Sequence, residues 1–429
     1  MYAFFCNLAV CDSQSFHPMS KRKILVLVTD AFPQPTATEP SFVAPELEML
    51  KRRFERVIIV PTTTVGISRP VELRGIDVEM GWAAGADWNR RIRRARYLLR
   101  PSVWIDSRGD FSRSGLAFGV AAHAFARFLK QMMHSKGLDW GDTLFYTFWF
   151  DFPAGALALL KERISEIRYV SRAHGHDMTT MLGGELRRKM LRQTERLFTA
   201  SEAGAEWIRT HFPAPGEGDK AIAETLGCEK LFPDTVAARH KRADRRLTFL
   251  SVSRVDRNKR VALNARLLKV LAVARPDTEI KWIHVGAGPA MDDVIAALES
   301  KPANLTAELR GAQTNEEVQK VYRDETVDWT MLLSEREGGR PVAACESLAY
   351  GVPVVASDIP GLNEVVVDDC GMLLPTDVTD EEFVRGIAPY LDSDLRSEAM
   401  RKAALDRWKE RFDARELRSA FVERLSSIQ

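Results

Sequence analysis

The fold is set by residues 334–357, which read S-E-R-E-G-G-R-P-V-A-A-C-E-S-L-A-Y-G-V-P-V-V-A-S. A short apolar run, residues 328–333, comes directly before them. Pro341 suits the first turn of a helix, helix-forming residues follow, and Gly351 ends the helix before a second apolar run. The stretch therefore predicts a strand, a glycine loop, a helix and a second strand in succession.

A glycine loop at the carboxyl end of a strand is the place where open α/β sheets bind ligands. The helix N-terminus after Gly338 and Gly339 offers N–H groups and the positive end of a dipole, so it suits a phosphate. Glu346 lies further along the helix, where it could accept hydrogen bonds from the hydroxyls of a neighbouring sugar. A glycine pair before a helix is also common in ordinary α/β proteins, so the ligand interpretation depends on the rest of the chain.

Length and composition are those of a soluble globular protein with more than one domain. The chain has 429 residues, of which 45% are hydrophobic and 28% are charged, and its net charge is +2. Such a balance does not indicate nucleic-acid binding. The five cysteines are scattered without a CxxC pair, which favours a reducing cytoplasm and argues against a metal cluster. No uninterrupted apolar run approaches the length of a membrane span.

Strand and helix patterns alternate through two halves of the chain. Residues 1–20 are expected to be a disordered extension without the features of a signal peptide. Residues 21–240 and 241–405 each predict a Rossmann-like domain, with the linker in the polar stretch from Cys228 to Arg246. A charged amphipathic helix is predicted over 406–429. We therefore expect an α/β protein with two doubly wound domains that face a cleft.

Two cations follow the first strand of the second half. Arg254 comes directly after the apolar run, and Lys259 lies five residues later. Arginine makes bidentate contacts and lysine supplies a point charge, so the pair would clamp a diphosphate and stabilise it as a leaving group. Gly286 and Gly288 follow the next strand, where they allow close backbone approach to a ligand or simply form a βα turn.

His174 and His176 lie at the end of a predicted strand in the first half, beside Asp177. Without a third ligand nearby they do not indicate a metal site, and a substrate-binding or catalytic role at this edge suits them better. The acidic pairs 292–293 and 368–369 are interpreted as surface residues.

The segment from Arg90 to Arg100 contains six arginines interleaved with apolar residues, and Trp88 and Trp104 flank it. A basic helix with flanking tryptophans suits an anionic membrane surface. A solvated basic face on a structural helix is the alternative, and the sequence alone leaves both open.

The second half resembles the retaining glycosyltransferases of family 4, which have the GT-B fold. The similar segments are S-V-S-R-V-D-R-N-K (251–259), W-I-H-V-G-A-G-P (282–289), R-G-A-Q-T-N-E-E (310–317), residues 334–357 and G-L-N-E (361–364). In the first half, Y-T-F-W-F (146–150), S-R-A-H-G-H-D (171–177) and S-E-A-G (201–204) also match. These segments look like those of members that act in bacterial capsule, exopolysaccharide or O-antigen assembly.

The resemblance implies a catalytic set of His174, Glu337, Arg254 and Lys259. Arg254 and Lys259 would bind the donor diphosphate, and Glu346 would hold the ribose hydroxyls. The other implied donor-binding residues are Gly286, Gly288, Gly311, Gly338, Gly339, Arg340 and Pro341. The C-terminal helix would cross back to the N-terminal, acceptor-binding domain. No metal or other cofactor would be required.

One departure from the family pattern concerns the first of two glutamates that the family places eight positions apart. Gly338 stands eight positions before Glu346, whereas Glu337 stands nine and Glu335 eleven positions before it. One extra residue in the glycine loop would let Glu337 take the place of the first glutamate.

The implied function is a cytoplasmic retaining glycosyltransferase that uses a UDP- or GDP-sugar. Its acceptor would be a saccharide or lipid-linked saccharide in bacterial surface or exopolysaccharide biosynthesis, met at the inner membrane face through Arg90–Arg100. One alternative is a non-catalytic GT-B scaffold, which the displaced glutamate favours. Another is a GT-B sugar-nucleotide epimerase, which would not need a membrane-facing basic helix. The sequence does not determine the donor sugar or the acceptor.

Overall fold

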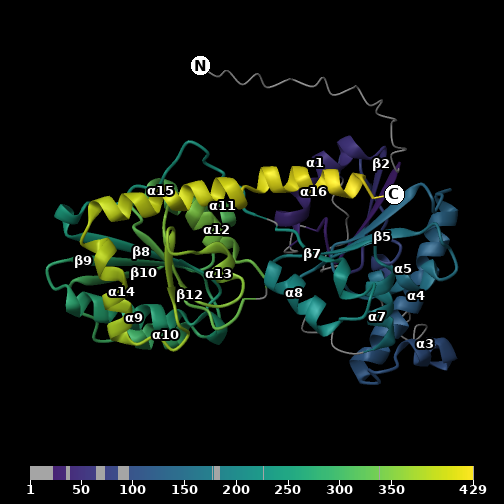
Figure 1. Ribbon diagram of the computed structural model, residues 1–429, viewed down its shortest axis with the longest axis horizontal. Helices are drawn as coiled ribbons and strands as arrows, with labels where there is room; N and C mark the ends of the chain where they lie inside the picture. Colours follow the sequence, from purple (N-terminus) through teal and green to yellow (C-terminus); the bar gives the residue numbers. More distant parts are fainter. Residues whose placement is uncertain are drawn as a thin grey trace, which may run out of the picture.

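The computed structural model describes residues 23–34, 39–63, 73–85, 96–175, 177, 184–225, 227–337 and 339–428. The predicted extension over residues 1–20, most of the Arg90–Arg100 segment, His176 and Gly338 lie outside these ranges. The described chain forms two α/β domains side by side, with a helical C-terminal segment running along both (Figure 1). Two Rossmann-like parallel sheets confirm the expected fold class.

The first domain is built on a parallel sheet of seven strands in the order β3-β2-β1-β4-β5-β6-β7. The interior strand β1 is a continuous apolar run, as expected for a strand covered by helices on both faces. The strands are β1 Ile24–Thr29, β2 Arg56–Pro61, β3 Asp77–Val78, β4 Thr143–Thr147, β5 Arg168–Ala173, β6 Arg196–Thr199 and β7 Ala221–Ala223.

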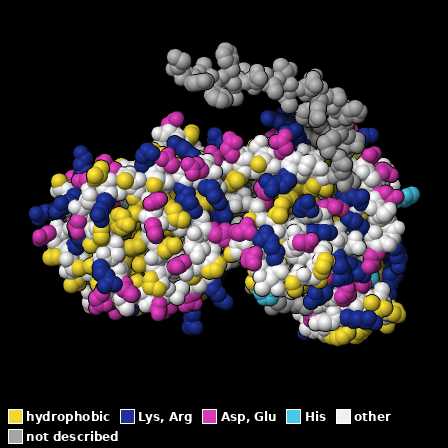
Figure 2. All heavy atoms as spheres, in the orientation of Figure 1, with side chains coloured by type: hydrophobic (Ala, Val, Ile, Leu, Met, Phe, Trp, Pro, Cys, Tyr) yellow, Lys and Arg dark blue, Asp and Glu magenta, His cyan; other side chains and the backbone are white. Residues whose placement is uncertain are grey.

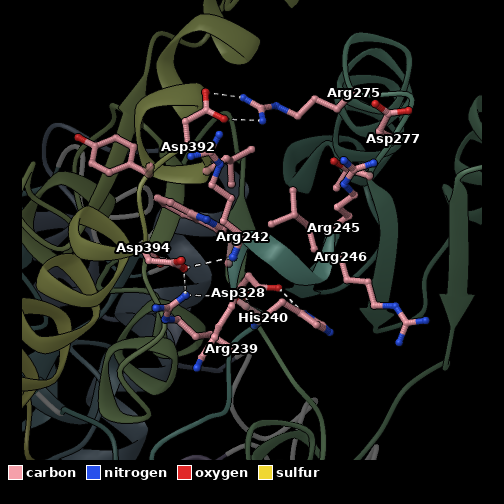
Figure 3. A pocket seen from close by; sticks show the side chains of 17 residues that line it. Arg239, His240, Arg242, Arg245, Arg246, Arg275, Asp277, Asp328, Asp392 and Asp394 are labelled. Carbon is pink, nitrogen blue, oxygen red and sulfur yellow. Dashed lines mark hydrogen bonds and ion pairs between the residues drawn. The ribbon is translucent and has the colours of Figure 1, made fainter.

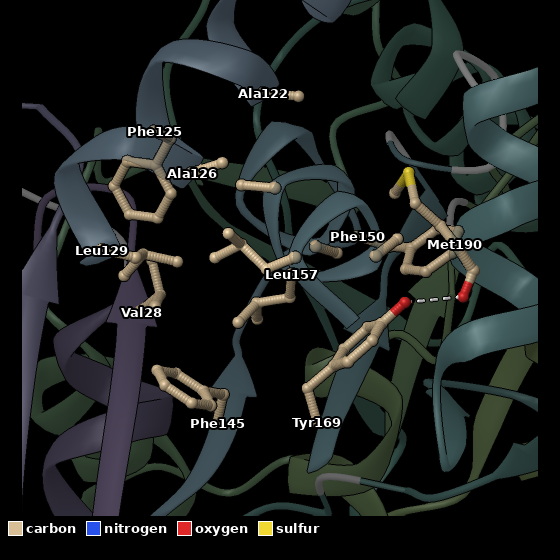
Figure 4. Close-up of a cluster of buried hydrophobic side chains, with 14 of the residues drawn as sticks. Val28, Ala122, Phe125, Ala126, Leu129, Phe145, Phe150, Leu157, Tyr169 and Met190 are labelled. Atoms are coloured by element: carbon tan, nitrogen blue, oxygen red, sulfur yellow. Dashed lines mark hydrogen bonds between the residues drawn. The ribbon is translucent and has the colours of Figure 1, made fainter. Parts of the chain in front are cut away.

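Helices pack an apolar core onto this sheet. They are α1 Pro40–Arg53, α3 Pro101–Asp106, α4 Arg113–Ser135, α5 Phe152–Lys161, α7 Glu185–Gln193 and α8 Glu202–His211. Phe125 of α4 and Leu157 of α5 are buried together with Phe145 of β4 (Figure 4). The Tyr169 hydroxyl donates a 2.8 Å hydrogen bond to the Met190 carbonyl, so the polar end of this buried ring is satisfied (Figure 4).

The second domain contains a parallel sheet of six strands in the order β10-β9-β8-β11-β12-β13. Its strands are β8 Arg246–Val252, β9 Glu279–Val285, β10 Leu305–Leu309, β11 Trp329–Leu332, β12 Val354–Ser357 and β13 Gly371–Leu374. Its helices are α9 Val261–Ala274, α10 Met291–Leu298, α11 Asn315–Asp324, α12 Val342–Ala349, α13 Leu362–Val365, α14 Asp380–Leu391 and α15 Asp394–Arg411. The strand, loop, helix and strand predicted around residues 334–357 are β11, its loop, α12 and β12.

The C-terminal segment crosses back to the first domain, as expected. The helix predicted over 406–429 is interrupted, however, because α15 ends at Arg411 and α16 spans Ala414–Ser426. Asp413 caps the new helix by accepting a 3.0 Å hydrogen bond from the Arg415 N–H. Three apolar side chains of α16 are buried in the first domain: Phe421, Val422 and Leu425.

The chain passes to the second domain after β7, and the residues that follow pack there. Cys228 and Ala237 are part of the second hydrophobic core, and the Cys228 N–H donates to the Phe412 carbonyl at 3.0 Å. The stretch predicted as a linker thus lies against the second domain, while the domain division at residue 240 stays a prediction. Among the described residues, no helix is long and apolar enough to cross a membrane.

Candidate functional site

A cavity of about 150 Å³ lies between the two domains. The first domain contributes His174 and Ala200 to its wall, and the second contributes Glu337, Gly339 and Arg340. Four residues predicted from the sequence for one site therefore come together here, although they belong to segments far apart in the chain. Gly338, which stands between Glu337 and Gly339 in the sequence, lies outside the described ranges.

Glu337 and Lys259 form the closest ionic contact of this site. The Lys259 Nζ lies 2.6 and 2.7 Å from the two carboxylate oxygens of Glu337, whose side chain is only 10% exposed. The loop around Lys259 is fixed by Asp256, which caps its N–H at 3.0 Å, and by Asn258. The Asn258 side chain donates to the Arg336 carbonyl at 3.0 Å. The glutamate loop and the cation loop are thus held as one unit.

Arg254 is exposed at the end of β8, on the same loop as Lys259. Gly286 and Gly288 lie in the neighbouring loop, where the backbone on either side of Arg254 leaves no space for a side chain. A Cβ on Gly286 would lie 1.8 Å from the Ser253 carbonyl oxygen, and one on Gly288 would lie 2.2 Å from that of Val255. These glycines therefore support the cation loop, while their predicted contact with a ligand stays a prediction.

Gly311 adopts a left-handed backbone with φ of 69°, and its carbonyl accepts a 2.8 Å hydrogen bond from the Gly286 N–H. Pro341 caps the N-terminus of α12, and Gly339 fits close to Ala200 of the first domain. A Cβ on Gly339 would lie 3.3 Å from that of Ala200, so the glycine allows the two domains to approach at the cavity.

Glu346 is buried in α12, with 4% of its surface exposed. Burial raises the pKa of its carboxyl from 4.5 to about 7, and a hydrogen bond from the Asn315 side-chain amide acts in the opposite direction. Gln319 donates to Asn315 at 3.0 Å and so orients the amide. Asn315 lies in one of the segments that resemble family 4 glycosyltransferases. Its contact with Glu346 could not be predicted, because it forms only when α11 and α12 pack together.

Arg340, which the sequence predicted as a donor-binding residue, makes contacts that link the two domains. Its guanidinium hydrogen-bonds the Thr225 hydroxyl, contacts Glu364 at 3.1 Å and stacks on Phe412 with 4.9 Å to the ring centroid. Glu364 in turn accepts 2.9 Å hydrogen bonds from two backbone N–H groups in the first turn of α8, those of Glu202 and Ala203. This interdomain contact was not predicted, because nothing in the local sequence pairs Glu364 with α8.

His174 sits on the first-domain side of the cavity between aromatic rings. Its ring centroid lies 4.4 Å from that of Trp149 and 5.0 Å from that of Phe148. The His174 backbone N–H donates to Asp177 at 2.7 Å, and the His174 Nδ1 lies 3.5 Å from a carboxylate oxygen of Asp177. Among the described residues, no cluster of three or more His, Cys, Asp or Glu side chains is arranged to hold a metal ion.

A second cavity of about 320 Å³ lies beside His174, within the first domain. It is lined by residues at the carboxyl ends of β1, β2 and β4 and at the turn after β5: Thr29, Asp30, Thr62, Thr63, Trp149, Asp151 and Asp177. Sequence reasoning did not identify this cavity. The only available signal was that an acidic residue follows each of β1, β4 and β5 within a few positions.

A third cavity of about 290 Å³ lies at the opposite, amino-terminal edge of the second sheet (Figure 3). It is rich in arginine, but much of this charge is already paired. Arg275 binds Asp392 at 2.7 and 2.9 Å, and Arg239 binds Asp394 at 2.7 Å (Figure 3). The helices α9 and α14 end here, and cations suit the negative ends of helix dipoles. We interpret these arginines as structural.

Residues 234–407 match the family model of "Glycosyl transferases group 1". No curated protein matches this sequence. Among solved structures, an alpha,alpha-trehalose-phosphate synthase (UDP-forming) from Burkholderia vietnamiensis is similar with a TM-score of 0.63 and 14% identity, covering 95% of this chain and 99% of that one.

Two further structures are similar over the same extent. A sucrose-phosphate synthase from Thermosynechococcus elongatus has a TM-score of 0.61 and 15% identity, covering 94% of this chain and 98% of that one. HepE of Anabaena, in complex with UDP, has a TM-score of 0.60 and 16% identity, covering 95% of this chain and 100% of that one. At these identities the similarity concerns the fold. The chain therefore has the GT-B fold, and residues 234–407 are similar to glycosyl transferases group 1.

Proposed function

We propose that this protein is a retaining glycosyltransferase that moves a sugar from a nucleotide-diphosphate sugar to a saccharide or lipid-linked saccharide. The observation that carries the proposal is the interdomain cavity, where Glu337 of the second domain and His174 of the first line one space. Lys259 binds Glu337 directly, so a cation able to hold a diphosphate stands at this place.

The proposed reaction is front-face transfer. The bond between the sugar C1 and the diphosphate oxygen breaks, and Arg254 and Lys259 stabilise the charge that develops on the leaving group. A bond from the acceptor hydroxyl oxygen to C1 forms on the same face, and the hydroxyl proton passes to the departing diphosphate oxygen. Glu337 contacts the donor sugar in place of the displaced family glutamate, and His174 approaches the sugar from the first domain.

The nucleotide is proposed to bind with its ribose hydroxyls at Glu346. The carboxyl accepts a hydrogen bond from Asn315 and has the capacity to accept further ones from hydroxyls. UDP is the favoured diphosphate, because HepE is described in complex with UDP and a similar synthase is described as UDP-forming.

The test is calorimetric binding of UDP, GDP and their sugars, combined with NMR analysis of the donor products. The proposal expects one diphosphate to bind and its sugar to be hydrolysed slowly to free diphosphate and a sugar of retained configuration. Glu337→Gln should keep nucleotide binding and lose hydrolysis, whereas Glu335→Gln, an exposed neighbour, should change neither. An altered sugar still attached to the nucleotide would indicate an epimerase, and no nucleotide binding at all would indicate a scaffold.

The place of action is proposed to be the cytoplasmic face of a bacterial membrane, in surface or exopolysaccharide synthesis. Support comes from α3 and the residues around it, where Leu99 is 85%, Phe111 57% and Ile105 49% exposed. Figure 2 shows hydrophobic and basic side chains side by side on this part of the first domain. Large apolar side chains next to arginines suit an anionic lipid surface.

Vesicle cosedimentation tests this placement. The wild type should bind vesicles that contain phosphatidylglycerol and not vesicles of phosphatidylcholine alone. Leu99→Asp should abolish this binding, whereas Val273→Asp, at an exposed apolar position in the second domain, should not. Equal binding of the wild type and Leu99→Asp would contradict the placement.

A further inference from the structure

The cavity in the first domain has the walls of a carbohydrate site. Trp149 contributes a partly buried aromatic ring, Asp30 and Asp151 contribute carboxylates, and Thr63 contributes a hydroxyl. Aromatic rings pack against the C–H faces of sugars, and carboxylates accept hydrogen bonds from their hydroxyls. The volume of about 320 Å³ is at the lower end of the range typical of small-molecule pockets.

The cavity shares a wall with the interdomain cavity. Trp149 lines the first-domain cavity and lies 4.4 Å from the ring of His174, which lines the interdomain cavity. Asp177 also lines the first-domain cavity and accepts the backbone N–H of His174 at 2.7 Å. A sugar held against Trp149 is therefore next to the place where Glu337 and Lys259 meet His174.

A buried carboxylate outside the cavity fixes these walls. Glu39 is 2% exposed and accepts backbone N–H groups from Asp30 at 2.7 Å, Ala31 at 2.8 Å and Phe32 at 2.7 Å. The same carboxylate accepts the indole Nε1–H of Trp149 at 2.7 Å. One side chain thereby sets both the loop after β1, which carries Asp30, and the orientation of the Trp149 ring.

The charges of the cavity favour one class of ligand. Asp30 accepts the Thr63 hydroxyl at 3.1 Å, and Asp151 accepts the Phe152 N–H at 2.7 Å, so both keep capacity for further donors. Burial raises the pKa of Asp151, the Phe152 N–H and the Arg187 cation lower it, and the nearby carboxylates of Asp177 and Asp30 raise it further. Since these groups already repel one another, a phosphate or carboxylate on the ligand would be repelled as well.

We infer that this cavity holds a hydroxyl-bearing sugar residue of the acceptor that carries no anionic group, with Trp149 and Asp151 as binding residues and Glu39 as a positioning residue. The assignment to the acceptor rests on the proposed glycosyltransferase function, whereas the recognition of a neutral sugar rests on the cavity itself. Acceptors that carry a phosphate or carboxylate on this residue are excluded.

The experiment uses saturation-transfer NMR on the full chain with the methyl glycosides of glucose, galactose and mannose as probes. Glucose 6-phosphate and glucuronic acid are the anionic counterparts. At least one neutral glycoside should bind, and the anionic probes should bind at least about tenfold more weakly. Asp151→Asn should weaken the neutral glycoside about tenfold, as expected when a hydrogen bond to a charged group becomes neutral. Asp139→Asn, an exposed change in the same domain, is the matched control.

Glu39→Gln tests the positioning role, because it keeps the size of the side chain but replaces one acceptor oxygen with an NH₂ group. It should weaken the neutral glycoside and alter the near-ultraviolet circular dichroism of Trp149, while the affinity for UDP stays unchanged. The spectral comparison with Trp149→Phe identifies the contribution of that indole. Loss of glycoside binding without a spectral change would overturn the positioning role.

Equal or tighter binding of glucose 6-phosphate or glucuronic acid would overturn the inference, and so would the absence of binding by every neutral glycoside. UDP binding, measured separately by calorimetry, distinguishes this failure from failure of the proposed function. If UDP does not bind but a neutral glycoside does, the transferase proposal fails and the sugar site stands.

Discussion

The carboxyl-terminal edges of the two sheets have the same architecture but opposite charge. At the first edge, the strands are followed by Asp30, Asp151 and Asp177, and at the second edge by Arg254 and Lys259. Both edges gather loop side chains from parallel strands, which is where such sheets form ligand sites. The two edges therefore differ in the charge of these side chains. The second edge suits a diphosphate, and the first suits a neutral, hydroxyl-rich ligand.

The two edges meet at the interdomain cavity, where one residue from each breaks the pattern. His174 belongs to the acidic edge, and Glu337 belongs to the basic edge. Glu337 is paired with Lys259, and the His174 Nδ1 lies 3.5 Å from the Asp177 carboxylate. The comparison shows how one fold, used twice, places two edges of different charge next to each other.

The largest expected effect concerns Glu346, the buried carboxyl near the basic edge. Its folded-state pKa of about 7 lies above the ordinary 4.5, so the folded protein retains a proton that the unfolded chain has already lost between these values. Stability is therefore expected to fall as the pH rises through this window, by about 3 kcal/mol in total. Glu346→Gln should remove this cost and weaken UDP binding.

Urea unfolding at pH 5 and pH 8 measures this effect. The variant should match the wild type more closely at pH 5 and exceed its stability by about 1–3 kcal/mol at pH 8. Glu316→Gln, an exposed change on α11, should show no such dependence on pH. A wild-type stability that rises between these two pH values relative to Glu346→Gln would contradict the expectation.

The next effect concerns Lys259 and tests the charge of the basic edge directly. Lys259→Ala should weaken UDP by about 10- to 100-fold, because hydrogen bonds between charged groups are worth about 1.5–3 kcal/mol each. Lys269→Ala is the matched control, since that lysine lies on α9 and donates a 2.6 Å hydrogen bond to the Glu299 carbonyl at the end of α10. Calorimetry gives the UDP affinities of both variants. An unchanged affinity in Lys259→Ala would contradict the proposal that this edge binds the diphosphate.

The smallest expected effect concerns Glu364, which holds the two edges together. Glu364→Gln weakens the contacts with α8 and Arg340, so the two domains should separate more readily in solution. Small-angle X-ray scattering should show a slightly larger radius of gyration, while the free energy of unfolding changes by less than about 1 kcal/mol. Glu335→Gln should leave the scattering curve unchanged. An identical curve for both variants would mean that Glu364 does not control the domain arrangement.

Local patterns in the sequence determined most of the fold. Apolar runs such as 24–29 and 354–357 form buried parallel strands, and Pro341 and Gly351 mark the two ends of α12 as expected. The break between α15 and α16 was missed, because Asp413 acts as an N-cap inside a pattern that otherwise reads as one helix. The cations of the second edge could also be identified in the sequence, because Arg254 directly follows a predicted strand and Lys259 comes five residues later.

Only the tertiary structure decided which of these residues meet. The pairing of Glu337 with Lys259, the contact of Glu364 with α8 and the four hydrogen bonds to Glu39 all join segments that are separate in the chain. Periodicity and capping act over a few residues, and they determine where strands and helices begin and end. Which side chains converge depends on sheet order and on the packing of two domains, and a local pattern in the sequence contains neither.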